Sequence, residues 1–144
     1  LRRVIEGEMA ALAAQRATRA QVADLKRALR AIDTATDGGE LGVEQDLAFH
    51  RAIGEATGNP QFVRLLGILE AYLRDAMTVT KGYESMRADF MEQVRREHRA
   101  IVEAVAAGDA KGARRAATQH HLNGEERLVM SGVIKPAKAT KVRR

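Results

Sequence analysis

Apolar residues recur every three to four positions along most of this chain, and no stretch alternates convincingly between apolar and polar residues. The first spacing is that of one buried face of an α-helix, whereas strict alternation would indicate a half-buried strand. The chain is also rich in Ala, Leu, Arg and Glu, which favour helices. We therefore predict an all-α fold in which helices with short links form an antiparallel bundle.

Turn and capping residues divide this pattern into six helices. Thr18 followed by Gln21 is a capping box, Asn59-Pro60 is a helix-start signal, and Gly108-Asp109 combines a helix end with a new cap. Lys81-Gly82-Tyr83 is interpreted as a short link. The predicted helices cover about residues 2–16, 18–32, 41–58, 61–80, 85–107 and 110–129.

The composition limits which classes of protein and site are open to the chain. Its 144 residues suffice for one domain with a real core. The absence of cysteine excludes disulfides and thiolate metal ligands, so a metal would need histidine and carboxylate ligands. No apolar run approaches the roughly 20 residues that cross a bilayer. We expect a cytoplasmic protein without a membrane partner, and Leu1 in place of Met suggests a piece of a longer polypeptide.

The net charge of +5 comes from the end of the chain. Five Lys and Arg and no acid lie within residues 133–144, while the remaining basic and acidic residues balance. We predict one domain over residues 1–130 and a basic, disordered tail over residues 131–144. Such a tail can contact nucleic-acid phosphates, although a basic terminus more often only improves solubility.

One carboxylate and three imidazoles occupy positions from which they can converge. Asp46 and His50 lie one helical turn apart and project from one face. His98 is ten residues before Gly108, and His120 is eleven after Asp109. In a tight antiparallel hairpin, residues equally distant from the turn come opposite each other. His98 shares its face with the apolar residues of its helix, and His120 shares its face with alanines, so both are predicted to point inward.

Four such groups would be costly inside a bundle unless something satisfied them. A divalent cation would do so, and this ligand set suits zinc, nickel, manganese or iron better than calcium. Taken singly, each signal has a simpler explanation: a hydrogen-bonded or surface Asp–His pair, a satisfied core histidine, or an exposed doublet at 120–121. The spacing alone leaves a metal site and these explanations open.

Three segments together resemble a known family. They are LRRVIEGEMAALAAQRAT, DLAFHRAIGEATGNP and EHRAIVEAVAAGDAKGARRAATQHHL. In order and spacing they resemble the ligand-binding C-terminal (FCD) domain of GntR-family transcriptional regulators of the FadR subgroup. The resemblance extends from Arg2 to about Leu122. It implies an all-α antiparallel bundle of six to seven helices that encloses a metal and ligand pocket.

The resemblance also implies site residues and partners. The family's metal ligands match Asp46, His50, His98 and His120, and zinc is the first metal expected. His121 stands where the family usually has Leu and is interpreted as an outward or second-shell neighbour. Family effectors are commonly small organic acids that meet the metal and an arginine. Arg2 and Arg74 are candidates for that arginine, and Asn123 is a candidate hydrogen-bond donor.

The function implied is sensing without catalysis. In the family a winged helix-turn-helix domain precedes the effector domain, and that domain is absent from this sequence. The expected partners are a small organic acid, operator DNA through the missing domain, and a second copy in a homodimer. Two alternatives are a metal-dependent hydrolase with a His₃Asp centre, which lacks an obvious general base, and a sensor of the metal itself.

Overall fold

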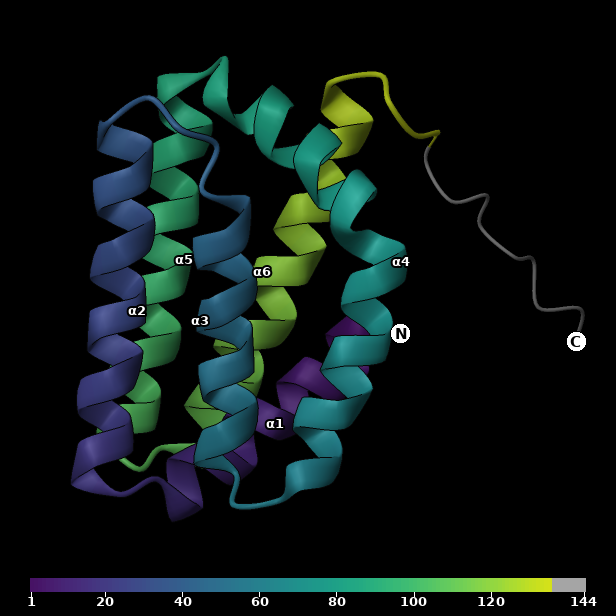
Figure 1. The fold of residues 1–144 in the computed structure, drawn as a ribbon. Helices are drawn as coiled ribbons and strands as arrows, with labels where there is room; N and C mark the ends of the chain where they lie inside the picture. The colour runs from purple at the N-terminus through teal and green to yellow at the C-terminus, as the bar shows by residue number, and fades with distance from the viewer. Residues whose placement is uncertain (136–144) are drawn as a thin grey trace, which may run out of the picture.

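The computed structural model describes residues 1–135, and these form six α-helices and no strand (Figure 1). The prediction of an all-α bundle is therefore confirmed. The helices are α1 (Arg2–Arg16), α2 (Arg19–Asp37), α3 (Val43–Ala56), α4 (Pro60–Ser85), α5 (Ala88–Ala106) and α6 (Ala110–Met130).

The predicted caps form where the sequence places them. Thr18 and Gln21 make both hydrogen bonds of the capping box at the start of α2. The Asn59 side chain accepts from the backbone N–H of Gln61, and Pro60 takes the first helical position of α4. The Asp109 side chain accepts from the backbone N–H of Gly112 at 2.8 Å. Each cap satisfies a donor that the first turn of a helix leaves free.

The predicted link at Lys81-Gly82-Tyr83 is wrong, because α4 continues through it to Ser85. A glycine inside a helix costs only about 1 kcal/mol relative to alanine. Buried ion pairs on both sides of Gly82 accompany the continuation: Lys81 contacts Asp46, and Glu84 contacts Arg127. The true break lies at Met86 and Arg87, before α5.

Helix α1 packs against α6, α3 and α5, so its middle is part of the core. Small residues allow α1 and α6 to approach closely: a Cβ added at Gly7 would lie 2.8 Å from Thr118 Oγ1. The largest fully buried apolar side chains at the centre are Met9, Leu25, Phe49 and Ile101. The close contact of α1 with α6 matters for the site because it brings Glu6 to His121 of α6.

Helices α5 and α6 form the predicted hairpin. Gly108 has φ = 70°, the left-handed conformation that favours glycine, at the end of α5. The apolar face of α5 is buried along its length, and His98 lies within it at 1% exposure. The hairpin therefore places His98 and His120 at one height, with ring centroids 4.6 Å apart.

Most of the predicted basic tail lies outside the described residues. Helix α6 ends at Met130, and residues 131–135 make a turn beyond it. Among the helices that the structure describes, none combines the length and the apolar character required to span a bilayer.

Replacing Asp109 with alanine is expected to lower the free energy of unfolding by about 1 kcal/mol, because the first turn of α6 loses its cap. Urea unfolding followed by circular dichroism measures the change. Asp75→Ala, which removes an exposed acid from α4 that caps nothing, is the matched control. Equal unfolding midpoints in the two variants would contradict the capping role.

Candidate metal centre

The structure brings Asp46, His50, His98 and His120 together from α3, α5 and α6. One ring nitrogen from each of the three histidines lies within 4.8 Å of the others. Asp46 adjoins two of them: its Oδ1 lies 3.1 Å from His98 Nε2, and its Oδ2 lies 3.9 Å from His50 Nε2. The three predicted histidine ligands therefore converge inside the bundle, and the predicted Asp46 ligand lies beside two of them.

Several buried polar atoms of this cluster lack hydrogen bonds. Among residues 1–135, the fully buried side-chain nitrogens and oxygens without a hydrogen-bond partner are Asp33 Oδ1, Asp46 Oδ1, His50 Nε2 and both ring nitrogens of His98. Four of these five atoms belong to predicted metal ligands. Native interiors satisfy nearly all such atoms, so each one left over requires an explanation. A metal ion at the centre of the cluster fits this donor set.

Carboxylates contact two of the imidazoles at their Nδ1 atoms. His120 Nδ1–H donates to Glu97 Oε2 at 2.8 Å, and His50 Nδ1 lies 2.6 Å from Glu6 Oε2. An ionised carboxylate only accepts hydrogen bonds, so Nδ1 of His120 carries the proton, and in the neutral ring Nε2 keeps its lone pair. This arrangement, in which a carboxylate orients the far side of a histidine, is the usual support of a metal ligand.

Burial and charge set the protonation states that metal binding requires. Burial lowers the pKa of His120 to about 3, against the opposing effect of Glu97, so this ring is neutral at pH 7. Burial by itself would raise the pKa of Asp46, but the Lys81 ammonium and the contact with His98 hold it well below its usual range. A neutral imidazole and an ionised carboxylate are the forms that bind a metal.

Glu97 stays ionised for a similar reason. Burial would raise its pKa, but hydrogen bonds from His120, Arg127 and Asn123 lower it to about 2. Arg127 is itself 3% exposed and binds Glu97 with two nitrogens at 2.9 and 3.1 Å. Glu97 is therefore fixed by several donors and is not free to act as the general base of a hydrolase.

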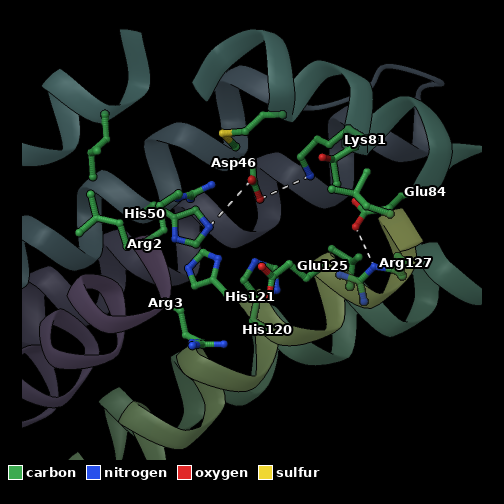
Figure 2. Close-up of a pocket in the computed structure, with 17 residues that line it drawn as sticks. Arg2, Arg3, Asp46, His50, Lys81, Glu84, His120, His121, Glu125 and Arg127 are labelled. Atoms are coloured by element: carbon green, nitrogen blue, oxygen red, sulfur yellow. Dashed lines mark hydrogen bonds and ion pairs between the residues drawn. The ribbon is translucent and has the colours of Figure 1, made fainter. Parts of the chain in front are cut away.

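A cavity of about 480 Å³ opens onto the cluster (Figure 2). Asp46, His50, His120 and His121 form part of its wall, and apolar side chains of α4, α5 and α6 form another part. Its volume is in the range typical of small-molecule sites. Basic side chains also line it, namely Arg2, Arg3, Lys81 and Arg127.

The three predicted ligand-binding residues are placed differently. Arg2 lines the cavity and its Nε donates to Glu6 Oε1 at 2.6 Å. Arg74 is exposed, pairs with Glu44, and is not among the residues that line the cavity. Asn123 donates to Glu97 at 2.6 Å and so supports the carboxylate behind His120, outside the cavity lining.

His121 faces the interior, so of the two predicted placements, outward or as a neighbour behind the ligands, the structure fits the second. Its Nε2–H donates to Glu6 Oε2 at 2.9 Å, and its ring lines the cavity. Both histidines of the doublet are enclosed because α6 has α1 on one side and α5 on the other. Glu6, His50 and His121 thus form a second group with metal-ligand spacing. The contacts of His50 and His121 with Glu6, at 2.6 and 2.9 Å, explain why that group is close together without a metal ion.

Sequence reasoning missed Lys81, Glu84 and Arg127. Lys81 and Glu84 fall in and after the supposed link, where no helical face was assigned. Arg127 did carry a signal, because it lies two turns after His120 and therefore on the same face of α6. Lys81 pairs with Asp46. Glu84 and Arg127 link α4, α6 and α5: Glu84 Oε1 accepts from Arg127 Nε at 2.8 Å, and Arg127 donates to Glu97 of α5.

Comparison with known proteins identifies similar sequences. The model of the FCD domain family matches residues 1–123. The HTH-type transcriptional regulator LutR of Bacillus subtilis (strain 168) is 32% identical over 133 residues, which cover 92% of this chain and 60% of LutR. The HTH-type transcriptional repressor NanR of Citrobacter rodentium (strain ICC168) is 35% identical over 127 residues, 85% of this chain and 46% of NanR.

A third relative is the putative L-lactate dehydrogenase operon regulatory protein of Escherichia coli (strain K12), 28% identical over 119 residues, 83% of this chain and 45% of that protein. The chain thus spans about half of the curated relatives it matches. These relatives are named as regulators, which supports the prediction that the domain is not an enzyme.

Proposed function

We propose that residues 1–130 of this chain, which belongs to the FCD domain family, form an effector-sensing domain. The whole protein would be a cytoplasmic transcriptional regulator of the GntR family, FadR subgroup. DNA reading is assigned to a winged helix-turn-helix domain outside this sequence. Two observations support this assignment: the relatives are named as HTH-type regulators, and the chain covers only part of their length.

The observation that carries the proposal is the group of buried atoms without hydrogen bonds on Asp46, His50 and His98. With His120, these residues would hold one divalent ion, and zinc is the first to test because it accepts imidazole and carboxylate ligands. Nickel, manganese and iron remain alternatives. When bound, the ion would supply a Lewis-acidic contact for an anion in the cavity.

The proposed effector is a small organic acid. The cavity offers basic side chains of α1 and α4 beside an apolar wall, which suits a carboxylate attached to a short carbon skeleton. Arg2 is the arginine retained from the prediction, whereas Arg74 is not included because it lies outside the cavity lining. One relative is named for an L-lactate dehydrogenase operon, so L-lactate heads the panel of acids.

Effector binding would act on DNA through a change in helix packing. A ligand moves a conformational equilibrium only as far as its affinities for the two states differ. A typical coupling of roughly 1–3 kcal/mol changes operator affinity about 5- to 150-fold. We propose a homodimer, since two DNA readers must match two half-sites. Exposed apolar side chains on α4, Ile68 and Tyr72 among them, offer a surface for the second copy.

The experiment for this proposal uses the full-length regulator and its operator. Fluorescence anisotropy is measured with the zinc-loaded protein, with and without L-lactate, acetate or malonate. The proposal predicts that at least one acid changes operator affinity at least fivefold. A response to zinc alone with no effect of any acid would favour the alternative that the domain senses the metal itself.

Glu97→Gln is expected to weaken zinc binding about 10- to 100-fold, because an amide supports the His120 ring less well than a carboxylate. Competition with a zinc chelator measures the affinity. Glu103→Gln removes an exposed acid from the same helix and serves as the control. An unchanged affinity in Glu97→Gln would contradict the orienting role.

A further inference from the structure

Lys81 lies in an unusual position for a lysine. It is on the inward side of α4 with 8% exposure, and its Nζ lies 3.4 Å from Asp46 Oδ1 (Figure 2). Asp46 Oδ1 has no hydrogen-bond partner, so this contact is an ion pair without an aligned hydrogen bond. Lysine is almost never buried unless it is paired with an acid. Here the paired acid is a predicted metal ligand.

Asp46 is the one acid within ion-pair distance of Lys81 among residues 1–135. Glu84, one turn further along α4, is occupied by Arg127. The ammonium thus places a positive charge beside the carboxylate that a metal ion would also bind.

We propose that Lys81 exchanges partners: it neutralises Asp46 in the metal-free domain, is displaced when an ion binds Asp46, and then receives the carboxylate of the effector. The inference rests on the proposed function, because it needs both the ion and the acid. It gives Lys81 an anion-binding role on the side of the cavity opposite Arg2. Neither the family resemblance nor the sequence pattern indicated this residue.

Electrostatics gives the direction of the exchange. A divalent ion and an ammonium on the same carboxylate repel each other strongly in a buried site. The lysine stem has four rotatable carbons and a compact charge, so it can move where a rigid side chain cannot. Lys81 lines both the main cavity and a narrow crevice of about 30 Å³ beside His98. It therefore has open space on two sides.

A carboxylate in the cavity is the natural new partner of the displaced ammonium. The competing partners are Glu125, which lines the cavity, and Glu40, which lines the crevice; either could take Lys81 in place of an effector. These two outcomes differ in one measurable respect: only the first makes the binding of an added acid depend on Lys81.

The metal half of the inference is tested with Lys81→Met, which keeps the length of the stem and removes the charge. Zinc affinity is measured by chelator competition on the purified domain. We expect zinc to bind at least about tenfold more tightly than in the wild type, because a competing cation is gone. Lys111→Met, an exposed lysine on α6, is the charge-matched control and should leave the affinity unchanged. Equal or weaker zinc binding in Lys81→Met would overturn the exchange.

The anion half uses the zinc-loaded proteins and the acids acetate, L-lactate and malonate, with L-lactamide as the uncharged probe. Thermal unfolding should show stabilisation of the wild type and of Lys111→Met by at least one acid and none by the amide. Lys81→Met should lose that stabilisation while still holding zinc. Lys81→Gln, a polar variant without the charge, repeats the test in case the methionine variant folds poorly.

The outcomes separate the inference from the function on which it rests. Equal stabilisation of wild type and Lys81→Met by an acid would overturn the role of Lys81 and leave the proposed effector class intact. If no acid stabilises the zinc-loaded wild type, the carboxylate part of the proposed function is wrong, and the inference falls with it.

Discussion

Replacing His98 with alanine is expected to abolish both metal retention and stabilisation by the effector. His98 is 1% exposed, and its Nε2 lies 3.1 Å from Asp46 Oδ1, at the centre of the predicted ligand set. Without His98 only three of the four predicted protein ligands remain for the ion. Plasma emission spectroscopy after dialysis should find about one zinc per chain in the wild type and almost none in the variant.

The matched control is His121→Leu, which places an apolar residue beside His120. His121 contacts Glu6 and is not among the four proposed ligands, so this variant should retain its zinc. Circular dichroism confirms that both variants are folded before metal is measured. Retained zinc in His98→Ala, or lost zinc in His121→Leu alone, would mean that the ion is held by the group around Glu6.

Phe49→Ala is expected to have the largest effect on stability, a loss of about 3–5 kcal/mol in the free energy of unfolding. Phe49 is fully buried on α3, and its ring centroid lies 4.9 Å from that of His98. Truncation removes the contacts that the Phe49 ring makes in the core and leaves a cavity beside His98. Zinc should also bind more weakly, because the His98 ring loses the surface that holds its orientation.

Urea unfolding of the metal-free protein measures the effect of Phe49→Ala without a contribution from zinc. Met86→Ala removes a long apolar side chain that is 78% exposed and should change stability by less than about 0.5 kcal/mol. A similar small change in Phe49→Ala would show that α3 does not depend on this side chain for its packing.

Much of the fold could be predicted because capping chemistry is local. Thr18, Asn59 and Asp109 each act on an N–H two or three residues away, so their signals survive without knowledge of the tertiary structure. The same locality made the α5–α6 hairpin predictable, and counting from Gly108 placed His98 opposite His120. The error at Gly82 arose because a single glycine is a weak break that tertiary contacts of Lys81 and Glu84 outweigh.

The supporting residues of the site could not be predicted in the same way. Glu6 reaches His121 because α1 packs closely on α6, a contact between residues 115 positions apart, and it reaches His50 because α1 also packs on α3. Arg127 reaches Glu84 and Glu97 on two other helices. Helical periodicity tells which face of a helix is buried, but not which charged groups of other helices meet there. Both histidines at 120–121 are enclosed for this reason.

The most direct test of the account is a crystal structure of the zinc-loaded domain with diffraction data recorded on both sides of the zinc absorption edge. The account predicts a single anomalous peak in the bundle, bound by Asp46, His50, His98 and His120. No peak within the bundle, or a peak bound by Glu6, His50 and His121 instead, would contradict it.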